Sequence, residues 1–349
     1  MKIDYEIEKK EKNHIDASLT IPYDVFDKAY KNLLKKEAEK IDIKGFRKGK
    51  VPSEIIEPQL KQALSLEALE QITPAYLTEL IKQEKIELVA PPQYTQLPDL
   101  NKEQDLKLNI RFTIMPEFKL GDLKNIKVQK ESSEVKTEEI DNTIKEMFEK
   151  SMIEDKGKQP TDKWAEKTGK LYKLENIKNL EDLKKEIEGL LKKEKDRIVT
   201  QNAHQEVMTK AVELSKIEIP QEAIEFEARE REKSFLHELK NANMTLEDFC
   251  KNNNTDIKTL RELWEKDAKE ALQADALLKL YGKTNEITVS EKELEESIEN
   301  LKKSRQEEIP EHVEKDEIWR NNIKNVIIKQ KAYKDLMEKV LKEKKEIKK

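Results

Sequence analysis

Residues 43–52 read IKGFRKGKVP, a polar stretch with two glycines that separates two segments of helical sequence. Pro22 begins the first segment and Pro52 begins the second, since proline suits the first turn of a helix. In both segments, apolar residues follow at helical spacing. In the first they are Phe26, Ala29, Tyr30, Leu33, Leu34 and Ala38; in the second they are Leu60, Leu64, Leu69, Ile72, Leu77, Leu80 and Ile81. The stretch is therefore predicted to be a loop between two helices, the second of which ends at Pro91–Pro92.

Alternating sequence, typical of β-strands, lies on either side of this helical pair. Apolar residues alternate from Ile3 to Ile7 and again from Ile15 to Ile21, with a polar break between the two runs. This pattern predicts a β-hairpin with one buried face. The run Leu106–Ile114 alternates in the same way after the second helix. Residues 1–115 are therefore predicted to form an α+β domain of ordinary size.

Beyond that domain the sequence becomes largely helical. Residues 116–159 are predicted to form an extended arm, with a short helix that begins at Thr137 and a polar connector after it. Residues 160–349 carry narrow apolar stripes at helical spacing beside heavily charged faces. The predicted fold is thus an α+β N-terminal domain, an extended arm, and a mostly α-helical, elongated C-terminal domain.

Three helix boundaries in the C-terminal part have local signals. Thr245 and Ser290 are each followed three residues later by a carboxylate, which is the pattern of a helix N-cap. Gly282 follows a long apolar-striped segment and is predicted to be the glycine just after the end of that helix.

Composition excludes several classes of protein. Charged residues make up 40% of the chain, against about 25% in an average protein, and hydrophobic residues only 36%. The net charge of −5 argues against a general DNA-binding protein, which needs a dominant basic face. With 7 glycines and 11 prolines, the sequence also has too few turn residues for an all-β fold. An elongated, helix-rich protein with modest cores is expected.

No catalytic residue, metal site or cofactor site is predicted. The four histidines, His14, His204, His237 and His312, are far apart and none belongs to an HExxH motif. The segment from Gly45 to Lys50 resembles a phosphate-binding loop, but it is one residue short and lacks the Ser or Thr that binds Mg²⁺. Cys250 is the only cysteine, so it forms no internal disulfide and is expected to be a small buried hydrophobic residue.

Signals for export and membrane insertion are not found in the sequence. The first ten residues contain no apolar segment typical of a secretory signal. No uninterrupted run of aliphatic residues, Met or Phe exceeds three residues, so no membrane-spanning segment is predicted. The sequence indicates a cytoplasmic protein with no membrane partner.

The loop quoted above is the candidate functional site. Its cations, Lys44, Arg47, Lys48 and Lys50, are opposed nearby only by Asp42, and Gly45 and Gly49 bracket Phe46. A rigidly presented aromatic residue beside cations suits docking on a protein surface, and the cations would favour an RNA-rich surface. The alternative is an ordinary connection between helices with solvated lysines.

GFRKGKVP, residues 45–52, resembles the signature of the trigger factor family of bacterial ribosome-associated chaperones. Four further stretches are similar to family landmarks and occur in the family's order. They are MPEFKLGDLKNIKVQKESSEVKTEEID, TDKWAEKTG, SKIEIPQEAIEFE and LLKLYGKTNEITVSEKELEESI. The resemblance therefore covers most of the chain.

This resemblance implies a function and a set of partners. Residues 1–115 would be a ribosome-binding domain that docks on a protein of the large subunit at the tunnel exit, beside ribosomal RNA, through Phe46, Arg47 and Lys48. Residues 160–349 would be the chaperone domain, which shields nascent or unfolded polypeptides without ATP. A self-associating free form is also implied by the resemblance.

The sequence departs from the family at one place. Family members usually carry a peptidyl-prolyl isomerase domain of roughly 100 residues between the arm and the helical domain. Only Phe148–Gln159 is available there, so isomerase activity is not transferred to this chain. Two alternatives to the chaperone remain: a helical scaffold that retains a docking loop, and a degenerate peptidyl-prolyl isomerase.

Overall fold

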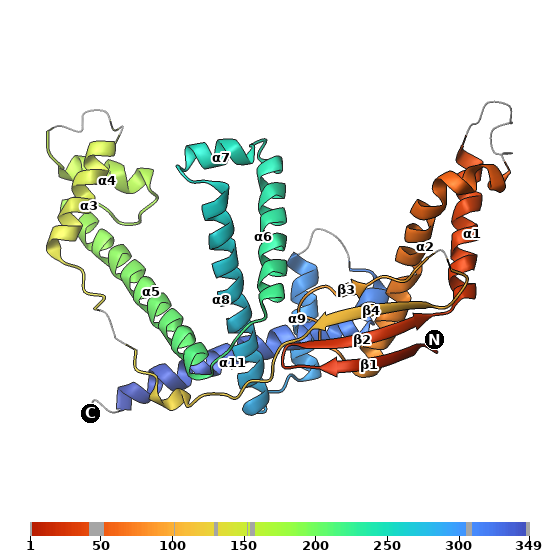
Figure 1. Ribbon diagram of the computed structural model, residues 1–349. Helices are drawn as coiled ribbons and strands as arrows, with labels where there is room; N and C mark the ends of the chain where they lie inside the picture. The colour runs from red at the N-terminus through yellow and green to blue at the C-terminus, as the bar shows by residue number, and fades with distance from the viewer. Residues whose placement is uncertain are drawn as a thin grey trace. The chain divides into compact units, whose positions relative to one another are not determined.

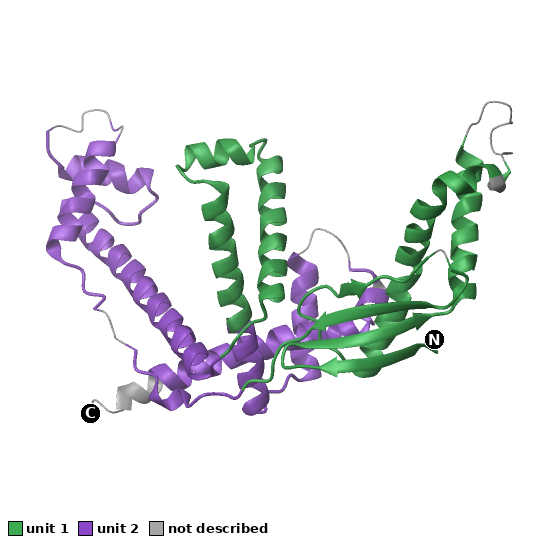
Figure 2. Ribbon diagram, in the orientation of Figure 1, with its two compact units in different colours: residues 1–118, 217–273 green, residues 119–216, 274–349 purple. Residues whose placement is uncertain are grey.

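The computed structural model describes residues 2–41, 52–100, 102–128, 132–151, 153, 158–304 and 309–346. Two units can be distinguished (Figure 2). The first contains residues 1–118 and 217–273, and the second contains residues 119–216 and 274–349.

The first unit contains a four-stranded antiparallel sheet (Figure 1). Its strands are β1 (Asp4–Lys10), β2 (His14–Ile21), β3 (Gln93–Gln96) and β4 (Leu106–Thr113), in the order β1-β2-β4-β3. In the central pair, Leu19 lies opposite Leu108 and Ala17 opposite Ile110. These four side chains are almost fully buried. The predicted hairpin and the predicted last strand are therefore confirmed, whereas β3 was not predicted.

Two helices complete the core of this part: α1 (Tyr23–Lys40) and α2 (Ser53–Glu84). The prolines at 22 and 52 immediately precede them, as predicted. Their facing sides and one face of the sheet share a single hydrophobic core that includes Phe26, Leu80 and Phe112. The prediction that α2 continues to Pro91–Pro92 is wrong. The helix ends at Glu84 because Lys85 adopts a left-handed conformation with φ of 53°.

The opposite face of the sheet carries an ion pair between neighbouring strands. The guanidinium of Arg111 donates two hydrogen bonds to the carboxylate of Asp16, at 2.7 and 2.9 Å. These hydrogen bonds lower the pKa of the Asp16 carboxyl below its usual value. The pair is only partly buried, with Arg111 39% exposed, so its contribution to stability is modest.

Acid should weaken the stabilisation that this pair provides. Because the pKa of Asp16 is lower in the folded state, the stabilisation is complete above the unfolded-state pKa of about 4 and is lost as the pH falls through the folded-state pKa. We expect the Asp16→Asn variant to be about 1 kcal/mol less stable than the wild type at pH 7. The difference should shrink below about pH 4. Urea unfolding of both proteins over a pH series measures it, and a difference that does not change with pH would contradict the assignment.

The first unit also contains a helical hairpin. It comprises α6 (Gln221–Asn241), α7 (Leu246–Asn252) and the first part of α8 (Ile257–Thr284). Thr245 caps α7, since its hydroxyl accepts a hydrogen bond from the backbone N–H of Asp248 at 3.1 Å. The N-cap predicted at this threonine is confirmed.

In the second unit, three helices form a small cluster. They are α3 (Thr137–Lys150), α4 (Asp162–Leu171) and the first turns of α5 (Leu180–Leu214). Their shared core contains Ile140, Ile144, Phe148, Trp164, Ala165, Ile177, Leu183 and Ile187. Lys195 of α5 adds an ion pair to Glu139 of α3 at 2.7 Å. We call this group the three-helix cluster.

The segment before α3 lies against the end of α5. It includes a short 3₁₀ turn, η1 (Leu123–Asn125), with Leu123 and Ile126 buried. The backbone N–H of Gly121 donates to the hydroxyl of Ser215 at 3.0 Å. A Cβ atom at Gly121 would lie 2.5 Å from the carbonyl oxygen of Leu214, so this close approach requires glycine. The segment predicted to be extended is thus held on α5, and its described residues form no strand.

The rest of the second unit consists of the end of α8, α9 (Glu291–Ser304), α10 (Glu311–Glu314) and α11 (Glu317–Glu346). The capping box at Ser290 is confirmed, since its backbone N–H donates to Glu293 at 2.8 Å. The prediction that Gly282 ends α8 is wrong. Gly282 lies inside the helix, where a Cβ atom would be 2.7 Å from a methyl group of Ile328 on α11.

Candidate functional site

The predicted docking loop lies outside the described residues. Its members are Lys44, Gly45, Phe46, Arg47, Lys48, Gly49 and Lys50. The structure does describe the two helices that the loop joins, α1 and α2, which pack side by side (Figure 1). The hydroxyl of Tyr30 on α1 donates to Glu57 on α2 at 3.0 Å. Burial and this hydrogen bond raise the pKa of Tyr30 to about 12, so the phenol stays protonated and the helices stay linked.

A second candidate site lies on the hairpin of α6, α7 and α8. The ring of Phe235 on α6 packs edge-on against Phe249 of α7, with centroids 4.9 Å apart. It also packs against Trp264 of α8, with centroids 5.5 Å apart. The apolar stripes predicted for residues 160–349 gave no functional role to any of these three rings. We call these three rings the aromatic triad. All three are half-buried and remain partly accessible at the surface of the hairpin.

Two shallow grooves run along this hairpin, and Trp264 lines both of them. One has a volume of about 380 Å³, and the other of about 310 Å³. The larger groove is lined by Glu227, Glu230, Arg231, Ser234, Phe235, Glu238, Trp264 and Asp267. Each groove therefore combines an aromatic floor with a charged rim. Such a surface suits weak contacts with many different apolar side chains.

The two long helices of the hairpin are also joined by an ion pair. Arg261 of α8 donates to the carboxylate of Glu232 on α6, with a shortest distance of 2.8 Å. This hydrogen bond raises the pKa of Arg261 above its usual value. Closer to the base of the hairpin, Ile224, Ala228 and Ala268 form a small buried core that Leu272 and Trp264 cover. The ion pair and this small core therefore fix the positions of the two helices that line the grooves.

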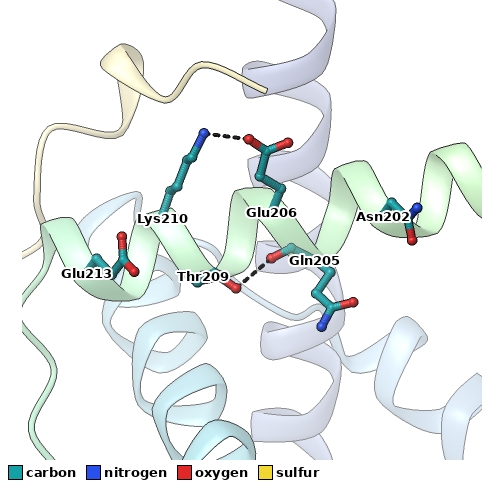
Figure 3. Close-up of a pocket in the computed structure, with 6 residues that line it drawn as sticks. All are labelled: Asn202, Gln205, Glu206, Thr209, Lys210 and Glu213. Carbon is teal, nitrogen blue, oxygen red and sulfur yellow. Dashed lines mark hydrogen bonds and ion pairs between the residues drawn. The ribbon is translucent and has the colours of Figure 1, made fainter. Parts of the chain in front are cut away.

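A third groove, of about 430 Å³, lies along α5 and is lined by residues with polar or charged side chains (Figure 3). Its lining is Asn202, Gln205, Glu206, Thr209, Lys210 and Glu213. The ammonium of Lys210 binds both Glu206 and the backbone carbonyl of Lys127. Thr209 donates to the carbonyl of Gln205 one turn earlier, at 3.0 Å. Lys210 therefore pairs with Glu206 within the groove and holds the segment that precedes α3 against α5.

Neither a metal-binding cluster nor a membrane-spanning helix is found in the part of the chain that the structure describes. Within those ranges, no three His, Cys, Asp or Glu side chains could together hold a metal ion. His204 contacts the hydroxyl of Tyr333 at 2.9 Å, which links α5 to α11. Cys250 is half-buried and so less enclosed than predicted. None of the described helices has both the length and the apolar composition needed to cross a bilayer.

Comparisons with known proteins cover most of the chain. A family profile described as bacterial trigger factor protein matches residues 3–147. A second profile, described as the C-terminus of the same protein, matches residues 179–338. The matched ranges include the docking loop, the sheet with α1 and α2, and the hairpin that carries the aromatic triad.

Individual relatives agree with the profiles. The trigger factor of Natranaerobius thermophilus is 25% identical over 388 aligned residues, which cover 86% of this chain and 87% of the relative. The trigger factor of Mannheimia succiniciproducens is 23% identical, and the aligned residues cover 90% of this chain and 91% of the relative. The trigger factor of Staphylococcus carnosus is 34% identical over a shorter alignment, which covers 39% of this chain and 31% of the relative. A solved structure titled "Promiscuous Substrate Recognition in Folding and Assembly Activities of the Trigger Factor Chaperone" aligns at 16% identity with a TM-score of 0.49, covering 97% of this chain and all of that one.

The described residues form an α+β domain and a helical hairpin whose shallow grooves combine aromatic side chains with a charged rim, an arrangement typical of a protein that binds other polypeptides. The two profile matches identify the family: the chain belongs to the trigger factor family. It lacks the isomerase domain, because α3 ends at Lys150 and α4 begins at Asp162. The residues between these helices are too few for a domain of about 100 residues.

Proposed function

We propose that this chain is an ATP-independent chaperone that docks at the exit of the ribosomal tunnel and shields nascent polypeptides during folding and export. In this proposal residues 1–115 bind the large subunit through Phe46, Arg47 and Lys48, flanked by Lys44, Gly45, Gly49 and Lys50. Residues 116–159 form the arm, and residues 160–349 bind the client. The protein would act in the cytoplasm and would self-associate when it is not bound to a ribosome.

The observation that carries the proposal is the sequence GFRKGKVP at the junction of two linked helices. An aromatic residue and an arginine presented together are typical of binding hot spots. Membership of the trigger factor family supports the proposal, because the signature occupies the expected place within the matched N-terminal range.

Co-sedimentation with purified bacterial ribosomes tests the docking. We expect the wild-type protein to pellet with ribosomes at low salt and to be released progressively as salt is raised. Aggregation of a chemically unfolded client should be suppressed equally with and without ATP. A protein that stays in the supernatant at every salt concentration would favour the alternative of a helical scaffold.

Client binding is predicted to depend on Trp264, the side chain shared by both grooves. Replacing it with alanine removes the aromatic side chain that both grooves share, and truncating a central aromatic anchor costs about 2 kcal/mol. We expect affinity for a fluorescently labelled unfolded polypeptide to fall about 30-fold, measured by anisotropy. Ribosome binding should be unchanged.

Leu272→Ala provides the matched control for this measurement. Leu272 covers the same small core but lines neither groove, so its truncation weakens the hairpin without removing a binding surface. If both variants lose affinity equally, hairpin stability rather than the groove controls binding. Trp264→Phe, which keeps an aromatic floor, should retain most of the affinity.

A further inference from the structure

We propose that the outer face of α1 is an RNA-binding surface that contacts the phosphate backbone of ribosomal RNA beside the docking loop. The proposal rests on the function proposed above and adds a second contact to it. The residues concerned are Lys28, Lys35 and Lys36, all on the described helix.

These lysines share the solvent face of α1. Lys28 and Lys35 are seven residues apart, which is two helical turns, and Lys36 is adjacent. All three are exposed, while the buried residues Phe26 and Leu33 lie on the opposite side. The other two lysines exposed on the helix have carboxylate partners, since Lys31 pairs with Asp27 at 2.7 Å and Lys40 pairs with Glu37.

The three lysines themselves have no such partner. Among the residues that the structure describes, no carboxylate lies within ion-pairing distance of Lys28, Lys35 or Lys36. Three ammonium groups without such partners leave a local excess of positive charge on this helical face. A polyanion would neutralise that excess. The arrangement therefore favours a negatively charged partner.

The distribution of charge along the chain points to the same segment. Residues 28–50 contain nine Lys or Arg and three Asp or Glu, a net charge of +6 in a chain whose total is −5. Residues 217–273, which form the hairpin with the grooves, contain nine Lys or Arg and fourteen Asp or Glu, a net charge of −5. An RNA surface would attract the first segment and repel the second.

The neighbouring part of α2 does not cancel this positive charge. From Pro58 to Leu66 the helix reads PQLKQALSL, which contains no carboxylate and one further lysine, Lys61. The first carboxylate before this run, Glu57, is engaged by Tyr30. A surface that approaches phosphates needs such a stretch without acidic groups.

The side chains on this face favour RNA over a protein partner. A protein interface is usually anchored by a large apolar or aromatic side chain that becomes buried. Helix α1 is described over its whole length and has no such residue among the large hydrophobic side chains that are strongly exposed. Lysines alone act as point charges, which suits binding to phosphate groups.

Two exposed carboxylates on this face, Asp24 and Glu39, oppose the proposed contact. Asp24 lies one turn before Lys28, and Glu39 is the closer of the two in sequence to the docking loop. Glu39 lies one turn beyond Lys35 and Lys36. If the face approaches phosphates, Glu39 reduces affinity. Its replacement by glutamine should therefore tighten ribosome binding, a gain that a merely structural role of the helix would not produce.

The main test is a salt series from 50 to 200 mM with the triple variant Lys28→Gln, Lys35→Gln and Lys36→Gln. The logarithm of the ribosome-binding constant should fall less steeply with the logarithm of the salt concentration. The slope should decrease by about 2–3, because each phosphate that a lysine neutralises contributes slightly less than one. Glu39→Gln should raise affinity at low salt.

A matched control exists on α5. Lys185, Lys192 and Lys193 have the same spacing and are also exposed, so their replacement by glutamine removes the same charge from another helix. Unlike Lys28, Lys185 has a carboxylate partner, Glu181, at 3.2 Å. This control should leave the slope unchanged. All substitutions are at exposed positions, and thermal unfolding monitored by circular dichroism will show whether the variants remain folded.

Failure of this proposal can be told apart from failure of the proposed function. If the wild-type protein does not bind ribosomes, both are wrong. If it binds through the docking loop but the α1 variant keeps the wild-type slope, only the RNA contact is wrong. A lower affinity with an unchanged slope would indicate a protein contact at α1, and an equal effect of the α5 control would indicate a general charge effect. Either result would overturn the proposal.

Discussion

Ribosome binding is expected to fall by about three orders of magnitude or more when Phe46, Arg47 and Lys48 are all replaced by alanine. Truncating an aromatic or arginine hot-spot residue costs about 2 kcal/mol or more. Two such truncations correspond to about a thousandfold change in affinity. Co-sedimentation at two salt concentrations measures the effect, because a micromolar interaction weakened to this extent leaves the protein in the supernatant.

Single variants separate the two parts of this prediction. Phe46→Ala removes an apolar anchor and should lower affinity without changing its dependence on salt. Lys48→Ala removes a cation and should reduce that dependence by about one phosphate contact. If the triple variant pellets as well as the wild type, the loop is only a connection between α1 and α2.

Most of the confirmed predictions rest on the regular spacing of apolar residues along the sequence. The alternation in β2 and β4 reports burial of one face of the sheet, and the spacing of Phe26 and Leu33 in α1 reports a helix with one buried side. Both are local consequences of a nearby core. The caps at Thr245 and Ser290 were predictable for a similar reason, because each involves residues only three apart.

The wrong predictions concern positions that distant parts of the chain determine. Gly282 has the sequence signature of a helix end, but here it allows α8 to approach Ile328 of α11. The strand β3 has no buried residue and therefore shows no alternation; it is fixed by its pairing with β4. The helix α2 ends at Lys85, a residue whose left-handed conformation has no local sequence signal.

The two candidate sites also differ in whether neighbouring or distant residues form them. The docking loop was predicted from its charge and its two glycines, which are visible in ten consecutive residues. The grooves were not predicted, because Phe235, Phe249 and Trp264 come together only when α7 reverses the chain. Each of these residues alone has the sequence pattern of an ordinary core residue.

The largest expected decrease in stability follows the substitution Trp164→Ala in the three-helix cluster. Trp164 is 1% exposed and packs edge-on against Phe148, with ring centroids 5.1 Å apart. Its indole N–H donates to the hydroxyl of Ser151 at 3.1 Å. Removing a buried tryptophan costs about 3–5 kcal/mol, a large share of what so small a core provides. We expect amide protection in α3 and α4 to fall at least about a hundredfold in native-state hydrogen exchange.

Two further variants identify which interaction is responsible. Trp164→Phe keeps an aromatic ring but loses the hydrogen bond, and Ser151→Ala removes only the hydroxyl that accepts it. Each should cost less than Trp164→Ala, because packing provides most of the stabilisation. Ser151 and Trp164 lie on either side of the short connection at which family members usually carry an isomerase domain. If Trp164→Ala leaves protection in α3 and α4 unchanged, these helices do not depend on the packing of Trp164, and the prediction is wrong.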